Sequence, residues 1–163
     1  MTTRESRVRT AMPKDRAVFL EMWDAFVATD PNEPGDRAMG ATNWTRIHDP
    51  ACALGCLVAV DADDRPQGFL LHLAFPFTWS KGEVCYLQDL YVKEEARGRG
   101  YAQALIQRLA AMGREAGWFK IFWMTQADNH TAQRLYDKLA LRSDFLRYDL
   151  ALTAAASPAR VER

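Results

Sequence analysis

Two glycines between a predicted strand and a predicted helix constrain this chain more than any other feature. Gly98 and Gly100 follow an apolar stretch that ends at Val92, and they precede an apolar stripe of helical spacing formed by Ala102, Leu105, Ile106 and Leu109. Glycine lacks a Cβ, so its backbone can take unusual angles and approach a ligand closely. The first amides of a helix have no intrahelical acceptor and bind anions, and Arg97 and Arg99 add further donors. This segment predicts a pyrophosphate cradle; a plain tight turn is the alternative for the glycines taken alone.

Other phosphate-binding and nucleic-acid-binding classes fit this segment less well. The run has neither the Gly-Lys-Ser/Thr of a P-loop nor the full G-x-G-x-x-G spacing of a dinucleotide fold. Lys plus Arg and Asp plus Glu both number 21, giving a formal net charge of +0, whereas nucleic-acid-binding domains carry a concentrated positive excess. We therefore expect a small anionic ligand and no nucleic acid.

The rest of the chain alternates between strand and helix patterns. Arg7 to Ala11 predicts a first strand, and a helix follows with an apolar stripe of Phe19, Met22, Trp23 and Phe26. A loop is expected from Asp30 to Asp36 and a weaker helix from about Asp36 to Ile47. Later strands are predicted at Gly55–Val60, Gln67–Ala74, Glu83–Val92, Trp118–Thr125 and Phe145–Leu150, with a helix capped by Asn129 whose stripe is Ala132, Leu135, Tyr136 and Leu139. This order predicts a mixed α/β sheet sandwiched by helices.

Length and composition favour one cytoplasmic domain. The 163 residues contain no interior linker or repeat, so we expect one domain over residues 5–152 and a disordered tail over 153–163. No signal peptide and no stretch of ~18 apolar residues is seen, so no membrane partner is expected. Cys52, Cys56 and Cys85 form no metal-binding or disulfide pattern, so we expect reduced thiols and no metal.

Two spaced patterns together resemble a known enzyme family. Arg97-x-x-Gly100-x-Ala102, after the strand Asp89-Leu90-Tyr91-Val92, resembles the acetyl-CoA signature of the GNAT superfamily of N-acetyltransferases. Asn129-x-x-Ala132-x-x-x-Tyr136, after a buried strand, resembles the second half of that pattern. The resemblance spans Glu83 to about Leu150 and is nearest to the diamine and small-amine acetyltransferases. It implies a mixed, mostly antiparallel sheet of about six to seven strands flanked by helices, acetyl-CoA as co-substrate, no metal, and a homodimer as one assembly that relatives adopt.

The resemblance also implies a role for each residue of the two patterns. The amides of Leu90 and Val92 would pair with the pantetheine arm, admitted by a splay between this strand and the Trp118–Thr125 strand. Asn129 would bind near the end of the pantetheine. The amides of the cradle would hold the pyrophosphate; its residues are Arg97, Gly98, Arg99, Gly100, Tyr101 and Ala102.

Acetyl transfer to an amine needs a proton donor for the thiolate and a route for the amine's proton. Tyr136 is the candidate acid, since a tyrosine can protonate the departing thiolate. Before the thiolate departs, a backbone N–H such as that of Leu90 would stabilise the oxyanion. Packing between Leu135 and Leu139 is the structural alternative for Tyr136. The proton acceptor stays open at this stage.

The acceptor side is less determined. Gln88 stands where related polyamine acetyltransferases carry a glutamate; it can hold a water or an amine but cannot take a proton. Strict strand alternation puts Asp89 on the opposite face, which leaves water, Glu33 or Asp24 as the base. Trp79 is the aromatic candidate for the acceptor wall. The predicted function is direct acetyl transfer from acetyl-CoA to a small-molecule primary amine; alternatives are a protein or peptide acceptor, and a non-catalytic acyl-CoA sensor, which the Gln88 departure favours.

Overall fold

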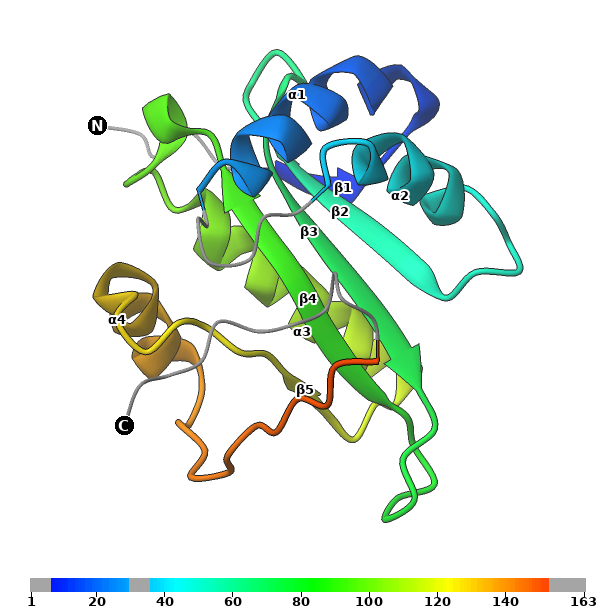
Figure 1. The fold of residues 1–163 in the computed structure, drawn as a ribbon. Helices are drawn as coiled ribbons and strands as arrows, with labels where there is room; N and C mark the ends of the chain where they lie inside the picture. The colour runs from blue at the N-terminus through cyan, green and yellow to red at the C-terminus, as the bar shows by residue number, and fades with distance from the viewer. Residues whose placement is uncertain (1–6, 30–35, 153–163) are drawn as a thin grey trace.

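The protein is described by a computed structural model over residues 7–29 and 36–152, and its architecture is a mixed α/β sheet with helices on both faces (Figure 1). The strands are β1 (Arg7–Thr10), β2 (Leu54–Val60), β3 (Pro66–Phe75), β4 (Val84–Val92) and β5 (Lys120–Phe122). The helices are α1 (Arg16–Val27), α2 (Met39–Ile47), α3 (Tyr101–Ala116) and α4 (His130–Leu139), with short 3-10 turns η1 (Pro13–Asp15) and η2 (Glu94–Ala96). The predicted tail, and Glu33 of the predicted loop, lie outside the described residues.

The strand order is the chain order, β1-β2-β3-β4-β5. The first four strands pair antiparallel, which suits connections as short as the polar turn between Val60 and Pro66. β5 pairs with β4 in parallel, because α3 carries the chain back across the sheet before β5 begins. The sheet is therefore mixed and mostly antiparallel, as the family resemblance implies, and its parallel strand β5 lies at an edge of the described sheet.

Two hydrophobic clusters lie on opposite faces of the sheet. The predicted α1 stripe is confirmed, since Phe19, Met22 and Trp23 are buried against β2, β3 and Tyr91 of β4. The other face packs against α3, whose Leu105 and Leu109 are 0 % exposed. α1 and α2 thus cover one face and α3 the other (Figure 1), and β4 is covered on both sides, which explains its continuous apolar sequence.

Two predicted strands differ from the structure. The predicted strand Trp118–Thr125 is shortened to Lys120–Phe122 because β4 pairs with it over three residues only. Phe145–Leu150 is not a strand in the described chain: no strand is assigned after β5, and the segment is exposed throughout. The described residues therefore form five strands rather than six to seven. A strand forms only where an adjacent edge accepts its backbone hydrogen bonds, and a hydrophobic pattern does not reveal that edge.

Candidate active site

The centre of the candidate site is the fork at which β4 and β5 separate. β4 pairs with β3 from Val84 to Val92, but its pairing with β5 stops at Tyr86 and Phe122. From Leu87 to Val92 the outer edge of β4 has no neighbouring strand among the described residues. Backbone N–H and C=O groups on such an edge are available to an extended ligand that hydrogen-bonds as a strand does. The predicted splay between these two strands is confirmed, and Leu90 and Val92 lie on its open side.

A β-bulge in β4 lies at the start of the fork. The register passes from Leu87 opposite His72 to Asp89 opposite Leu71, so Gln88 has no direct partner on β3. Before the bulge Leu87 faces the α3 cluster, and after it Leu90 faces the same cluster. Alternation counted from either side then puts both Gln88 and Asp89 on the α1/α2 face. The sequence expectation that these two side chains point to opposite faces is wrong, because it assumed an unbroken strand.

Asp89 becomes a candidate functional residue through this bulge. Its neighbour across the sheet, Leu71, belongs to the cluster under α1 and α2. Burial raises the pKa of Asp89 to about 6, since an apolar surrounding disfavours the carboxylate. Gln88 beside it is exposed. A carboxyl group with its pKa raised towards neutrality, at the mouth of an open strand edge, is suited to binding a cationic amine and accepting its proton.

The glycine loop after β4 has the geometry of an anion cradle. Gly98 has φ 75° and Gly100 has φ 84°, both in the left-handed region that favours glycine, so the predicted unusual backbone is confirmed. Gly100 is the N-cap of α3, and the first turn of α3 contains no acidic side chain. A Cβ built on either glycine meets no atom within 4 Å in the described part of the chain. The space beside both glycines is therefore open, and it lies at the N-terminus of α3, where the helix dipole is positive.

The remaining cradle residues hold this loop in place. The Nε of Arg97 donates to the carbonyl oxygen of Val92 at 3.2 Å, and its guanidinium lies over the Tyr91 ring, 6.0 Å from the centroid. Tyr101 is buried in the α3 cluster, whereas Arg99 is exposed. Both arginines are exposed; Arg97 ties the loop to the end of β4, whereas the side chain of Arg99 extends into solvent beside the cradle.

α4 places two predicted site residues on the far side of the fork. Asn129 is the N-cap, and its Oδ1 accepts from the amide of Ala132 at 3.2 Å, which confirms the predicted cap. Tyr136 lies two turns further on, half-buried, with its ring edge-on to Trp123 at 5.4 Å. Burial raises the pKa of Tyr136 above its usual value, so the phenol stays protonated and able to donate.

Trp79 is not brought onto the sheet face with Gln88 and Asp89. It lies in the β3–β4 connection, is 86 % exposed, and contacts Phe77, with ring centroids 6.2 Å apart. A different aromatic group lies on the sheet near the bulge: Tyr86 stacks on Phe122, and Phe122 meets Phe75 edge-on. Asp24, the described one of the two alternative bases, is exposed on α1.

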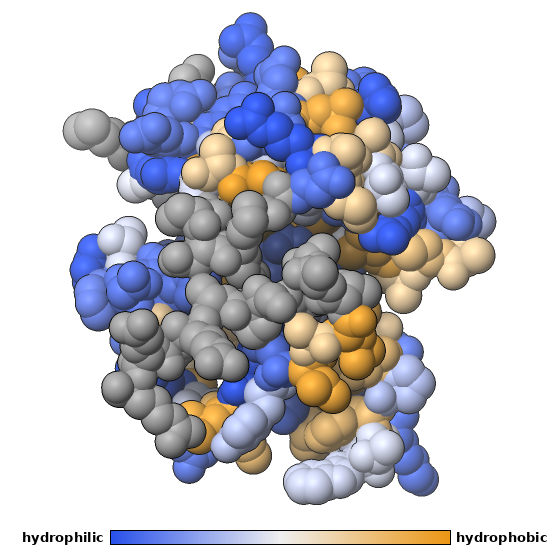
Figure 2. All heavy atoms as spheres, viewed as in Figure 1, coloured by the Kyte–Doolittle hydropathy of each residue, from blue (hydrophilic) through white to orange (hydrophobic). Residues whose placement is uncertain are grey.

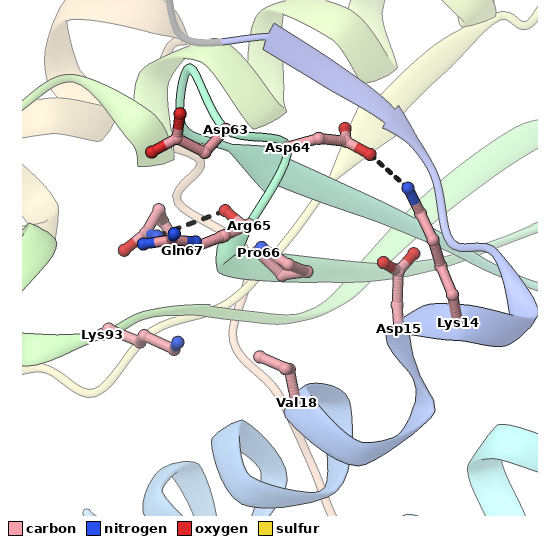
Figure 3. Close-up of a pocket in the computed structure, with 9 residues that line it drawn as sticks. All are labelled: Lys14, Asp15, Val18, Asp63, Asp64, Arg65, Pro66, Gln67 and Lys93. Atoms are coloured by element: carbon pink, nitrogen blue, oxygen red, sulfur yellow. Dashed lines mark hydrogen bonds and ion pairs between the residues drawn. The ribbon is translucent and has the colours of Figure 1, made fainter.

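A separate pocket of about 300 Å³ lies between η1 and the β2–β3 turn (Figure 3). An ion-pair network occupies its wall: Arg9 binds Asp15 at 2.6 Å and Asp64 at 2.9 Å, and Lys14 binds Asp64. Burial opposes ionisation of Asp15, but hydrogen bonds from Arg9 and the Met12 amide outweigh it and lower its pKa. These charges neutralise one another, and the ion pairs hold β1, η1 and the β2–β3 turn together beside the pocket.

The described residues contain no group of three or more His, Cys, Asp or Glu side chains that could hold a metal ion. Within the same residues, none of the helices combines the length and apolar character needed to cross a membrane.

Comparison with known proteins finds one family pattern and several relatives that match this chain. The pattern of the "Acetyltransferase (GNAT) family" matches residues 16–140. The D-amino-acid N-acetyltransferase HPA3 of Saccharomyces cerevisiae is 30% identical over 142 residues, covering 86% of this chain and 88% of the relative. A thialysine N-epsilon-acetyltransferase of Bos taurus is 34% identical over 91 residues, covering 52% of this chain and 53% of the relative.

Solved structures show the same fold. A crystal structure of a probable acetyltransferase superposes with a TM-score of 0.79 at 23% identity, covering 90% of this chain and 98% of that one. A ribosomal-protein-alanine N-acetyltransferase from Brucella melitensis biovar Abortus 2308 superposes with a TM-score of 0.74 at 20% identity, covering 91% of this chain and 100% of that one. At these identities the likeness concerns the fold alone.

Proposed function

Because this chain belongs to the GNAT family of acetyltransferases, we propose that it transfers the acetyl group of acetyl-CoA directly to the primary amine of a small molecule. The observation that supports this most is the fork: from Leu87 to Val92 no strand of the described chain pairs with the outer edge of β4, and the short turn η2 leads from this edge to the cradle at Gly98 and Gly100. An extended arm ending in a pyrophosphate matches that combination of strand edge and helix N-terminus. Acetyl-CoA supplies the activated thioester.

Different residues of the fork and the cradle would bind different parts of acetyl-CoA. The amides of Leu90 and Val92 are positioned to pair with the pantetheine arm, and the cradle amides from Arg97 to Ala102 with the pyrophosphate. Asn129 uses its Oδ1 as the helix cap, so its Nδ2 is the group left to donate towards the arm. The amide of Leu90 is the donor assigned to the thioester oxygen.

Two ionisable side chains near the fork have protonation states suited to catalysis: Asp89 to accepting a proton and Tyr136 to donating one. We assign Asp89 as the base: a carboxylate with a pKa of about 6 is mostly ionised at neutral pH, attracts an ammonium group and accepts its proton. Tyr136 is assigned as the acid, because its raised pKa keeps the proton that the thiolate takes. Asp89 replaces the water, Glu33 and Asp24 alternatives, and it disfavours the non-catalytic sensor that Gln88 suggested.

A small amine is the proposed acceptor class. The names of two relatives refer to D-amino acids and thialysine, both of which carry an amine on a small molecule. Asp89 offers the negative charge for that amine, and the Tyr86–Phe122 stack offers an apolar wall on the same sheet face.

The test is calorimetric titration of the full chain with acetyl-CoA, followed by an assay of CoA thiol release with a panel of amines. The panel contains D-amino acids, L-amino acids, thialysine, polyamines and a peptide with a free amino terminus. We expect micromolar-range binding and turnover with at least one small amine. Binding without turnover on any amine would favour the sensor, turnover of the peptide alone would favour the protein acceptor, and a folded protein that does not bind would remove the proposal.

A further inference from the structure

Apolar side chains continue along the α1/α2 face of the sheet beyond the cluster under these two helices. That cluster includes Phe69 and Leu71 of β3. Leu73 and Phe75 follow at every second position of the same strand, so their side chains point to the same face, but neither belongs to either hydrophobic cluster. Leu73 is half-buried and Phe75 is 36 % exposed. This end of the face therefore presents apolar side chains that lie outside the described core.

Three aromatic rings form one surface at this end of the face. Tyr86 of β4 stacks on Phe122 of β5 with ring centroids 5.1 Å apart, and Phe122 meets Phe75 of β3 edge-on at 6.3 Å. Tyr86 lies directly opposite Leu73 in the register, which places it on the same face. Figure 2 shows hydrophobic residues at the surface in the lower half of the molecule, below the place of α1 and α2 in Figure 1. Phe75, Tyr86 and Phe122 together are called the ring surface below.

The ring surface begins close to Asp89. Tyr86 and Asp89 both lie on the α1/α2 face of β4, with the bulge between them. A strand rises about 3.3 Å per residue, so three positions span at most about 10 Å. A primary amine held by the Asp89 carboxylate therefore brings a substituent of that length over the rings. The proposed base and the ring surface thus lie close enough to bind two parts of one small acceptor.

The charges on this face favour an acceptor with one positive charge. Asp89 is the one carboxylate in the five described strands. Lys120 lies two positions before Phe122 in β5 and so on the same face, and its ammonium lies 5.2 Å from the centroid of the Phe77 ring. Aromatic rings attract ammonium groups, but Lys120 already supplies that charge at the far end of the ring surface. A second ammonium on the acceptor would meet this like charge and no carboxylate from a described strand.

We propose that the acceptor is a primary amine with a single positive charge and an aromatic or large apolar substituent, and that Phe75 is a specificity-determining residue for it. The inference rests on the proposed acetyl transfer and names the acceptor class within it. Asp89 binds the amine, and the ring surface removes the substituent from water. Diamines and polyamines are poorer acceptors, because no carboxylate of the described strands is left for their second charge.

The substituent takes no part in the chemical step. The amine nitrogen forms a bond to the acetyl carbon while the bond between that carbon and sulfur breaks. An ammonium group loses two protons on becoming an amide: Asp89 accepts the first before the attack and passes it to water, and the second balances the proton that Tyr136 gives to the thiolate. The ring surface therefore acts on acceptor binding, so a change in it should alter the KM for the acceptor more than kcat.

Three amines that share a four-carbon chain test the acceptor class on the wild-type protein: butylamine, 4-phenylbutylamine and 1,4-diaminobutane. Release of CoA thiol at saturating acetyl-CoA gives kcat/KM for each. We expect 4-phenylbutylamine to exceed the other two at least about tenfold, because only its substituent covers the rings. If 1,4-diaminobutane or butylamine is used equally well, the inference is wrong while the proposed acetyl transfer stands. No turnover of any of the three overturns the inference too, and titration with acetyl-CoA then shows whether the acetyl-CoA site has failed with it.

Phe75→Ala tests the ring surface at a ring that lies on β3, outside the fork. We expect the KM for 4-phenylbutylamine to rise at least about fivefold, with kcat and the KM for butylamine nearly unchanged, since butylamine has no ring to lose the contact. Phe119→Ala is the matched control: this ring is 57 % exposed, stacks on Phe77 outside the ring surface, and should change no KM when removed. Thermal melts check that both variants fold. An equal rise for butylamine and 4-phenylbutylamine, or no rise for either, would overturn the role of Phe75.

Discussion

Tyr86 and Phe122 stack ring on ring at the last position where β4 and β5 pair, with centroids 5.1 Å apart and planes 15° apart. Beyond this pair the two strands separate, so the stack marks the point where the fork begins. Stacking of large rings across neighbouring strands stabilises the pairing beneath them. The position of the fork is thus set by two side chains outside the glycine cradle.

Removing the stack is expected to weaken use of acetyl-CoA. Tyr86→Ala should cost about 2 kcal/mol of folding stability, since the ring is half-buried, and should raise the KM for acetyl-CoA severalfold because the fork then opens nearer Val84. Phe75→Ala removes another ring that contacts Phe122 but lies on β3, and should leave this KM unchanged. Thermal melts and steady-state kinetics measure both; equal KM effects in the two variants would contradict the assignment.

The cradle can be tested against a glycine of the same conformation in the same helix. Gly100 (φ 84°) and Gly117 (φ 72°) cap opposite ends of α3, and a Cβ at either meets no atom within 4 Å in the described chain. Glutamate at either position puts a Cβ on left-handed backbone, so the two substitutions cause a similar strain of roughly 1–2 kcal/mol. Calorimetry should show that Gly100→Glu lowers acetyl-CoA affinity at least tenfold, because its charge repels the pyrophosphate, while Gly117→Glu retains it. Equal affinities would place the pyrophosphate elsewhere.

Tyr136→Phe removes the phenolic hydroxyl and keeps the ring, so it tests the proton donor alone. The ring contact with Trp123 is kept, so the melting temperature should stay within a degree or two of wild type. We expect kcat to fall on the order of 10²-fold with little change in KM, since a general acid contributes mainly to the chemical step. Single-turnover measurements of acetyl transfer provide the comparison, and a variant with full kcat would leave Tyr136 as a packing residue only.

Asp89→Asn tests the base through the pH profile. A carboxylate acts as a base only when ionised, so wild-type kcat/KM should rise as the pH increases through about 6, and the variant should lose most activity and that limb of the profile. Because burial raises the pKa of Asp89 from 3.8 to about 6, the folded state loses stability as the pH rises between these values, and the loss persists at pH 8; the variant should therefore melt higher than wild type at pH 8. Asp24→Asn on the exposed surface of α1 is the control and should change neither. A variant that keeps the limb would exclude Asp89.

The sequence predicts local features of this site well. The cap by Asn129 depends on neighbours three residues away, and the left-handed glycines depend on the missing Cβ, so both follow from short stretches of sequence. The bulge at Gln88 was missed because β4 is apolar on both faces, which leaves no period from which to detect a break. The predicted strand at 145–150 has the alternating pattern of a strand but is not a strand in the described chain. Whether such a segment forms a strand depends on a sheet edge far away in the sequence, which no local pattern specifies.

The buried His72 is expected to make the folded state less stable at low pH. Its ring lies on the α3 face beside Trp118, its Nδ1 has no hydrogen-bond partner in the described structure, and burial lowers its pKa to about 4. The folded state therefore favours the neutral imidazole. Its stability is fully present above the unfolded pKa of ~6.5 and is lost as the pH falls towards 4.

His72→Leu is expected to remove this loss of folding stability at low pH. The leucine is close to the imidazole in size and takes up no proton, so the free energy of unfolding should fall less between pH 6.5 and 4.5 than in wild type. Urea unfolding at several pH values measures the slope. Gly55→Ala provides a second check on the packing, because a Cβ there would lie 2.5 Å from the His72 ring and should destabilise the protein at every pH. Identical pH slopes for wild type and His72→Leu would show that another group carries the acid sensitivity.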